Sequence, residues 1–246
     1  MSAEKLLKLI SDEDAEYVDI RFTDPRGKLQ HVTVMSDQVD ADFIEEGFMF
    51  DGSSIAGWKS IEASDMKLMM DTDSGYVDPF YAEKTICVHC YVVEPDTGEA
   101  YNRDPRGTAM KAEAYLKSSG IGDTFFVGPE AEFFLFDDVR FSNSMNKVSF
   151  EVDALDASWN TDTEYEIGNT GHRPGVKGGY FPVNPTDDGQ DIRSEMLSTM
   201  KRLGMSVDKH HHEVASCQHE LGLIFSSLTK QGDELQKFKY VIHNVA

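Results

Sequence analysis

The feature that most constrains the fold is a pair of alternating stretches near the N-terminus. In YVDIRFT (17–23) apolar residues alternate with polar ones, and they do so again in LQHVTV (29–34). Between them stands DPRG (24–27), which is rich in turn-forming residues. Alternation gives each strand one apolar face, and a short connection containing Pro and Gly lets two such strands pair. The sequence therefore predicts a β-hairpin at this position.

Other segments near the N-terminus predict a helix and a further strand. Residues 4–12 have a helical apolar stripe, and KTICVHCYVVE predicts a strand at 85–93 that is closed by the turn EPDTGE. The stretch 47–83 has no clear periodicity, so we expect it to be irregular. Together these elements predict a small α+β domain over residues 1–103.

A second domain is predicted over residues 104–246, and it begins with a helix. Asp104 is a favourable N-cap, Pro105 a favourable first helical residue and Gly120 a favourable end. Further along, QDIRSEMLSTMKRLG (190–204) has the spacing of an amphipathic helix that ends at a glycine. The domain therefore combines helices with the strands considered next.

The rest of this domain is predicted to contain an apolar strand, loops and a last helix. DTFFVGPEAEFFLFDD (123–138) predicts a strand, and 139–190, rich in Gly, Asn, Asp and Pro, predicts long loops. DELQKFKYVIHNVA (233–246) has helical periodicity and stops without a cap or a polar tail. We therefore expect the chain to be a truncated part of a longer protein.

Charge and composition argue against several classes of function. Acidic residues outnumber basic ones 44 to 23, and the formal net charge of −21 disfavours binding to nucleic acid or to an anionic membrane. No apolar run approaches the ~20 residues that span a bilayer, and the N-terminus lacks the pattern of a secretory signal. The chain has 3 cysteines, an odd and sparse number that suits a reducing compartment, so we expect a cytoplasmic protein.

Two glutamates in the apolar strand are the first candidates for a functional site. Glu130 and Glu132 are two residues apart, so in a strand they share one face and lie roughly 6.6 Å apart. Carboxylates in apolar surroundings need compensation, which Mg²⁺ or Mn²⁺ provides by accepting oxygen ligands. The spacing alone leaves three alternatives open: a metal site, a face that opens to water or pairs with Lys or Arg, and the carboxylate pair of a glycoside hydrolase.

The segment KHHHEVASCQHELG (209–222) adds two more acids. Its spacing is not H-E-x-x-H, because Ser216 stands where the second histidine would be needed, and this excludes the helix of a zinc protease. HHHEVA predicts a strand and ELGLIF a return strand, so Glu213 and Glu220 can approach each other across a hairpin. We expect the histidines of the segment to pack or hydrogen-bond beside the site. They are His210, His211, His212 and His219.

A series of motifs, taken in order, resembles the N-terminal half of bacterial type I glutamine synthetases. The resemblance runs from residue 4 to 246, and FDGSS followed by ASDMKL matches the N-terminal signature of that family. The motifs are FMFDGSSIAGWKSIEASDMKL, NRDPR, GPEAEFFLFDD, GHRPGVKGGYFPV, QDIRSEM, HHHEVA and KYVIHNVA.

The resemblance implies both a fold and an activity. The fold is α+β, with a β-grasp-like N-terminal domain followed by the first part of a catalytic domain whose antiparallel sheet lines a funnel for two or three Mg²⁺ or Mn²⁺ ions. The activity is the ATP-dependent ligation of ammonia to L-glutamate through γ-glutamyl phosphate, which yields glutamine in nitrogen assimilation. L-Glutamate, ammonium and ATP are the implied substrates, and the implied assembly is a dodecamer of two hexameric rings.

The resemblance also assigns metal ligands. Glu132, Glu213 and Glu220 correspond to the ligands of the metal on the glutamate side, and Glu130 corresponds to a ligand of the metal on the ATP side. This agrees with the acid pair found from spacing, because one face of a strand can serve two cations. Such cations neutralise phosphate charge during phosphoryl transfer.

Other positions correspond to substrate contacts in the family. Asp51 and Ser53 match a loop that reaches the active site of a neighbouring subunit, where the aspartate helps to bind ammonium and to take a proton from it. Tyr180 matches a tyrosine on the ammonium side. Asp208 stands where the family usually has a glutamate that contacts the nucleotide, and Phe225 matches a residue near the nucleotide base.

Two departures from the family keep alternatives open. The chain has one residue fewer between Glu213 and Glu220 than some members have. It also ends before the half that supplies the remaining metal ligands, the arginines that bind glutamate and the tyrosine that is adenylylated in many bacterial members. Two alternatives therefore stand beside glutamine synthesis: ligation of glutamate to another amine, and a non-catalytic fragment that associates with full-length subunits.

Overall fold

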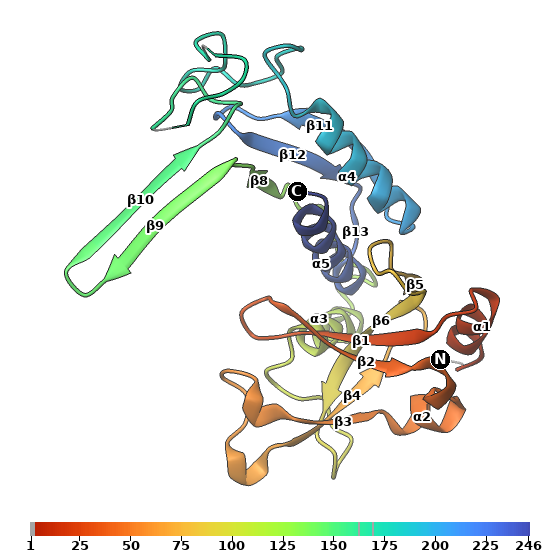
Figure 1. The fold of residues 1–246 in the computed structure, drawn as a ribbon. Helices are drawn as coiled ribbons and strands as arrows, with labels where there is room; N and C mark the ends of the chain where they lie inside the picture. The colour runs from red at the N-terminus through yellow and green to blue at the C-terminus, as the bar shows by residue number, and fades with distance from the viewer. Residues whose placement is uncertain (1–2, 162, 169) are drawn as a thin grey trace. The chain divides into compact units, whose positions relative to one another are not determined.

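The computed structural model of the chain describes residues 3–161, 163–168 and 170–246, which divide into two compact units (Figure 1). The first unit contains the described residues up to Val127 together with Ser226–Gln236. The second contains Gly128–Phe225 and Lys237–Ala246. None of the helices in these described ranges is long and apolar enough to cross a membrane.

The first unit is built on a sheet of strand order β2-β1-β6-β4-β3, with β5 paired to β6. β1 (Tyr17–Thr23) and β2 (Leu29–Met35) form the predicted antiparallel hairpin. β6 (Thr85–Val93) has the predicted limits and runs parallel to β1, in the centre of the sheet. The burial of apolar residues along β1 and β6 makes these two strands the core of the unit.

The expectation that 47–83 is irregular was wrong. This stretch contains the strands β3 (Phe48–Asp51), β4 (Asp65–Met70) and β5 (Tyr76–Val77). Short 3₁₀ turns at Gly52–Ser54 and Ile61–Ala63 separate β3 from β4. Each strand is therefore too brief for its alternation to stand out in the sequence.

Helices complete the first unit. α1 (Glu4–Asp12) buries Leu6, α2 (Ala41–Glu46) packs against β4, and α3 (Pro105–Ser119) packs against β6. The predicted limits of α3 are confirmed, because the Asp104 carboxylate accepts hydrogen bonds from the N–H groups of Arg106 and Gly107. At its other end Gly120 has a φ of 72°, the left-handed conformation in which glycine ends a helix.

The second unit contains an antiparallel sheet of strand order β11-β12-β8. β11 (Val207–His212) and β12 (Gln218–Leu223) form the predicted hairpin, and β8 (Glu132–Phe134) pairs with the outer side of β12. Figure 1 shows α4 (Gln190–Arg202) lying along β11. α5 (Leu228–Val245) begins five residues before 233, where the last helix was predicted to start. Its N-terminal part belongs to the first unit and its C-terminal part to the second.

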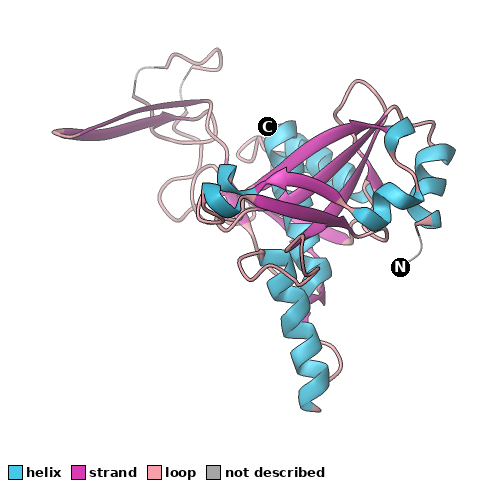
Figure 2. Ribbon diagram, turned by 90° about the horizontal axis from the view of Figure 1, so that it is seen from below, coloured by secondary structure: helices cyan, strands magenta, loops and turns pink. Residues whose placement is uncertain are grey.

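Two predictions for the segment 123–190 were wrong. Residues 123–138 do not form one strand, because the chain leaves the extended pairing at Gly128 and Pro129 and proline cannot donate to a ladder. Residues 139–190 are not all loop either. β9 (Asp138–Ser144) and β10 (Lys147–Asp153) form a hairpin, which extends away from β11 and β12 in Figure 1 and is the long two-stranded ribbon in Figure 2. The strand that precedes the break, β7 (Phe126–Val127), pairs with β13 (Ser226–Ser227) in the first unit.

Candidate metal centre

Antiparallel pairing gathers acidic residues on one face of the sheet β11-β12-β8. Glu220 in β12 lies directly opposite His211 in β11 and directly opposite Glu132 in β8. Residues that are directly opposite point their side chains to the same face, so these three form a row across the sheet. Glu213 follows His211 by two residues, and its N–H donates to the Gln218 carbonyl at 2.7 Å, which continues the ladder. Its side chain therefore joins the same face.

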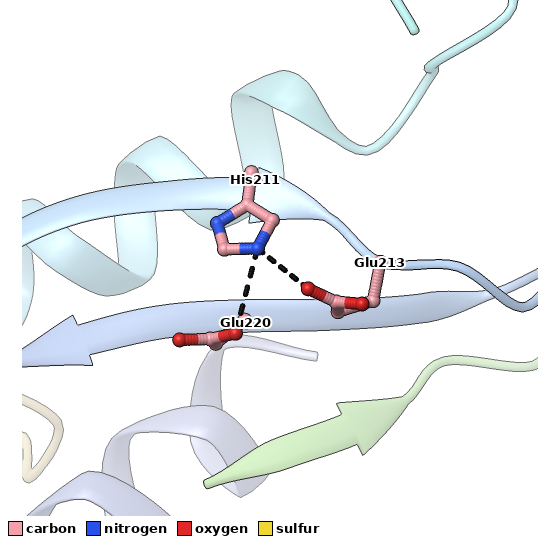
Figure 3. A group of neighbouring side chains, drawn as sticks. All are labelled: His211, Glu213 and Glu220. Atoms are coloured by element: carbon pink, nitrogen blue, oxygen red, sulfur yellow. Dashed lines mark hydrogen bonds and ion pairs between the residues drawn. The ribbon is translucent and has the colours of Figure 1, made fainter. Parts of the chain in front are cut away.

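His211, Glu213 and Glu220 form a compact cluster on this face (Figure 3). One potential ligand atom from each residue lies within 4.8 Å of the others. His211 Nε2 lies 2.7 Å from Glu213 Oε1 and 3.4 Å from Glu220 Oε2. Both glutamates are almost fully buried. Two buried carboxylates beside an imidazole form a donor set that suits a divalent cation.

The electrostatics of the two glutamates also favour a cation. Burial raises the pKa of Glu220, and the negative charges of Glu213 and Glu130 raise it further against the opposing effect of His211. Burial acts on Glu213 in the same direction, but hydrogen bonds from His211 and from the Val214 N–H outweigh it and lower the pKa of Glu213. A bound cation would offset the repulsion between the two carboxylates, so the residues present fit a metal.

The acids that were singled out on the 123–138 segment lie at the edge of this cluster. Glu132 is exposed, and its Oε2 accepts a hydrogen bond from Gln218 Nε2 at 2.5 Å. Glu130 stands before β8 begins, so the prediction that both acids share one continuous strand was wrong. Its charge nevertheless contributes to the raised pKa of Glu220. The structure therefore gathers Glu213 and Glu220 in one cluster, places Glu132 opposite Glu220 on the same sheet, and leaves Glu130 just before β8.

The residues expected to contact substrates in this unit are more exposed. Tyr180 is exposed and presents its ring edge-on to His211, with 5.8 Å between the ring centroids. Phe225 is 63% exposed. Asp208 is an exposed residue of β11, and its carboxylate lies against Gly222 in β12.

Asp51 and Ser53 belong to the first unit. Asp51 ends β3, and its Oδ1 accepts hydrogen bonds from the Ser53 N–H at 2.8 Å and from the Ser53 hydroxyl at 2.6 Å. These hydrogen bonds lower the pKa of Asp51 below its ordinary value. The side chain is therefore an exposed, ionised carboxylate that is held in one orientation by the following turn.

Sequence reasoning left two features out of the site. It placed His211 beside the carboxylates, whereas the structure places the His211 ring in contact with both Glu213 and Glu220. The signal in the sequence was that His211 stands two residues before Glu213, which puts both on one face of a strand. Sequence reasoning also made nothing of Phe181, whose ring lies edge-on to His211 at 4.8 Å and stacks on Tyr180 at 3.9 Å. Phe181 has a φ of 59°, which is rare for a bulky residue and could not be read from the sequence.

The other histidines of the segment face the opposite side of the sheet, toward α4. Arg193, which is fully buried, donates from Nη1 to His219 Nδ1 at 2.9 Å and from Nε to His210 Nδ1 at 3.3 Å. Burial and the adjacent Arg193 charge lower the pKa of His219 to about 4. His212 lies against Asp156 instead, and the hydrogen bond and charge of Asp156 raise its pKa despite burial. The two faces of the sheet therefore differ: one carries the acidic cluster, and the other carries histidines that are hydrogen-bonded to Arg193 and Asp156.

Comparison with known proteins connects this arrangement to one family. The profile for "Glutamine synthetase, catalytic domain" matches residues 102–246, and the profile for "Glutamine synthetase, beta-Grasp domain" matches residues 14–95. The chain belongs to the glutamine synthetase family. This confirms the resemblance drawn from the motifs, and with it the expected fold, in which a β-grasp domain precedes part of the catalytic domain.

Individual members of the family are similar along the whole chain. The glutamine synthetases of Cereibacter sphaeroides and Rhodobacter capsulatus are 73% and 71% identical, over 98% and 100% of this chain. The chain spans 51% and 56% of their lengths, about half of each relative. The cryo-EM structure of Plasmodium falciparum glutamine synthetase superimposes with a TM-score of 0.90 at 25% identity, over 100% of this chain and 48% of that one.

Proposed function

We propose that the chain is the N-terminal part of a glutamine synthetase, which ligates ammonia to L-glutamate in an ATP-dependent reaction through γ-glutamyl phosphate. The observation that carries the proposal is the cluster of His211, Glu213 and Glu220 on one sheet face, in a chain that is 73% identical to a glutamine synthetase. The proposal includes a role in nitrogen assimilation, a cytoplasmic location and the division into domains 1–103 and 104–246.

The carboxylates of the second unit have metal-binding roles in this proposal. Glu132, Glu213 and Glu220 hold a Mg²⁺ or Mn²⁺ ion on the glutamate side, and Glu130 holds one on the ATP side. When bound, two or three such ions supply positive charge to the phosphates of ATP. The convergence of Glu213 and Glu220 within 4.8 Å supports this assignment, because oxygen ligands must surround one ion.

The remaining assignments concern the substrates. Asp51 receives a proton from ammonium in the active site of a neighbouring subunit, and Ser53 holds the aspartate through the two hydrogen bonds described above. Tyr180 lines the ammonium side. Asp208 and Phe225 contact the nucleotide, and the exposure of both residues supports these assignments.

Assembly into a homo-oligomer, a dodecamer of two hexameric rings, is also part of the proposal. The β9–β10 hairpin supports self-association, because its cross-strand pairs place apolar side chains on one face. Phe141 and Phe150 are directly opposite each other and are 79% and 76% exposed. An amphipathic hairpin whose apolar face is this exposed is suited to packing against another copy.

Metal binding by the 246-residue chain tests the proposed centre. We expect the chain to bind Mn²⁺, measured by the EPR signal of free Mn²⁺, and we expect Glu213→Gln and Glu220→Gln each to raise the Kd by at least about tenfold. Glu151→Gln, which removes an acid of β10 outside the cluster, is the matched control and should bind as the wild type does. Equal affinity of all four proteins would refute the centre.

Catalysis is tested in the full-length protein. Glu132→Ala should abolish γ-glutamyl transfer in the presence of Mn²⁺, and near-normal turnover would refute the assignment of Glu132. The same assay on the isolated 246-residue chain separates the catalytic proposal from the non-catalytic alternative. We expect no turnover by the isolated chain, because about half the length of the related enzymes is outside it.

A further inference from the structure

One buried carboxylate below the sheet contacts both limbs of the turn that joins β11 to β12. Asp156 is 7% exposed, and its Oδ2 accepts a hydrogen bond from the Cys217 N–H at 2.6 Å. The same oxygen lies 2.8 Å from Nε2 of His212, at the end of β11. The turn between these two contacts carries Glu213 at its start, and Glu220 follows in β12.

His212 connects Asp156 to the backbone of Glu213. Its Nδ1 lies 2.7 Å from the Glu213 carbonyl oxygen, while its Nε2 is held by Asp156. The imidazole therefore bridges the Asp156 carboxylate and the main chain of a residue in the metal cluster. On the second limb the Asp156 contact is direct, and it anchors Cys217, which has a φ of 66°. A left-handed conformation is costly for a residue other than glycine unless its surroundings hold it.

The surroundings of Asp156 argue against a role in packing alone. Ala154, Ala157 and Cys217 form a small buried apolar cluster around this position. Burying a carboxylate in such a place is costly unless its hydrogen bonds compensate for the lost water. The hydrogen bonds that Oδ2 makes are both to the turn. An apolar side chain would fill the same space without that cost, so the carboxylate is explained by what it holds.

We propose that Asp156 is a positioning residue for the metal cluster: it clamps the β11–β12 turn so that Glu213 and Glu220 converge on one ion. Asp156 itself contacts neither carboxylate in the cluster, and it acts through His212 and the Cys217 amide. The proposal rests on the metal centre proposed above. Outer-shell partners of this kind typically contribute about 10–100-fold to metal affinity.

The test is the Mn²⁺ affinity of the 246-residue chain, with the EPR spectrum of bound Mn²⁺ recorded in parallel. Asp156→Asn keeps the shape of the side chain but removes its charge, and a neutral amide oxygen accepts weaker hydrogen bonds than a carboxylate, so we expect the Kd to rise about tenfold. The spectrum of the bound ion should change as well, because the ligands are held less symmetrically. Asp191→Asn is the matched control, since Asp191 is an exposed acid in the first turn of α4, outside the β11–β12 hairpin; its Kd should stay within about twofold of the wild type.

A second variant separates positioning from general loss of structure. His212→Gln interrupts the bridge from the other end, so it should weaken Mn²⁺ binding as Asp156→Asn does, and the double variant should be little worse than either single one. Thermal unfolding of each variant shows whether the chain still folds; if Asp156→Asn does not fold, His212→Gln decides. Wild-type affinity in Asp156→Asn would overturn the positioning role and leave the centre intact. Failure of the wild-type chain to bind Mn²⁺ would instead overturn the centre itself.

Discussion

At the scale of single residues, the site depends on a close backbone approach that only glycine allows. Gly179 donates its N–H to the Val214 carbonyl at 2.9 Å, which places residues 179–181 along the end of β11. A Cβ at this position would lie 2.6 Å from the Glu213 carbonyl oxygen and 2.7 Å from the His212 ring. The same segment carries Phe181, whose ring packs on His211, so the approach also sets the position of the aromatic side of the cluster.

Gly179→Ala should therefore disturb both stability and metal binding. We expect a loss of about 1–3 kcal/mol in the free energy of unfolding, because the added methyl group meets the Glu213 carbonyl oxygen and the His212 ring, which is itself held by hydrogen bonds. The Kd for Mn²⁺ should rise in the same variant. Gly175→Ala in the same loop is the control, since its Cβ would meet nothing within 4 Å, and urea denaturation should show little change. Equal unfolding free energies of the two variants would contradict this account.

At the scale of elements, local signals predicted most of the helices and the β1–β2 and β11–β12 hairpins, but they missed the β9–β10 hairpin, and they could not supply long-range pairing. α3 was predictable because Asp104, Pro105 and Gly120 act on their own neighbours in the chain. The β11–β12 hairpin was predicted from HHHEVA as one strand and ELGLIF as the return strand, and with it the approach of Glu213 to Glu220. No local pattern places Glu132 opposite Glu220, because that contact depends on which strand β8 joins.

Asp19, the hydrogen-bonded acid of β1, makes the stability of the first unit's sheet depend on pH. Asp19 is fully buried, and although burial favours its neutral form, the charge of Arg21 and the hydrogen bonds from His31, Arg21 and Thr33 lower its pKa. A carboxyl whose pKa is lower in the folded state stabilises the fold above its unfolded pKa of about 3.9, and this contribution is lost as the pH falls through the folded pKa. The sheet should therefore lose stability in acid below about pH 4.

Asp19→Asn measures that contribution. We expect it to lower the free energy of unfolding by about 3 kcal/mol at pH 7, because Arg21 loses one partner in a buried network. The difference from the wild type should narrow as the pH is lowered from 4 to 2, measured by urea denaturation at each pH. Asp12→Asn removes an exposed ion pair with Lys8 and should stay within about 1 kcal/mol of the wild type throughout. A difference in unfolding free energy between Asp19→Asn and the wild type that does not change with pH would show that folding does not lower the pKa of Asp19.

At the scale of the whole molecule, the charge and the apolar surface act in opposite directions. A net charge of −21 keeps copies of the chain apart in dilute salt. The β9–β10 hairpin opposes this, because Val139, Phe141, Val148 and Phe150 are all exposed on it. The sequence analysis predicted loop here, and both the hairpin and the exposure of its apolar residues are features that the folded chain reveals (Figure 1).

Replacing the exposed aromatic pair should reduce self-association without unfolding the chain. We expect the double variant Phe141→Ser, Phe150→Ser to sediment as smaller species than the wild type at the same concentration, and the wild type to associate further as added salt screens its charge. The melting temperature should change little, because both side chains are already exposed to water. Ser142→Ala with Ser149→Ala, a cross-strand pair on the opposite face of the same hairpin, is the control and should sediment as the wild type does. If the phenylalanine variant and its control have the same sedimentation profile, the hairpin face is not a contact between copies, and the support that it lends to the oligomer is withdrawn.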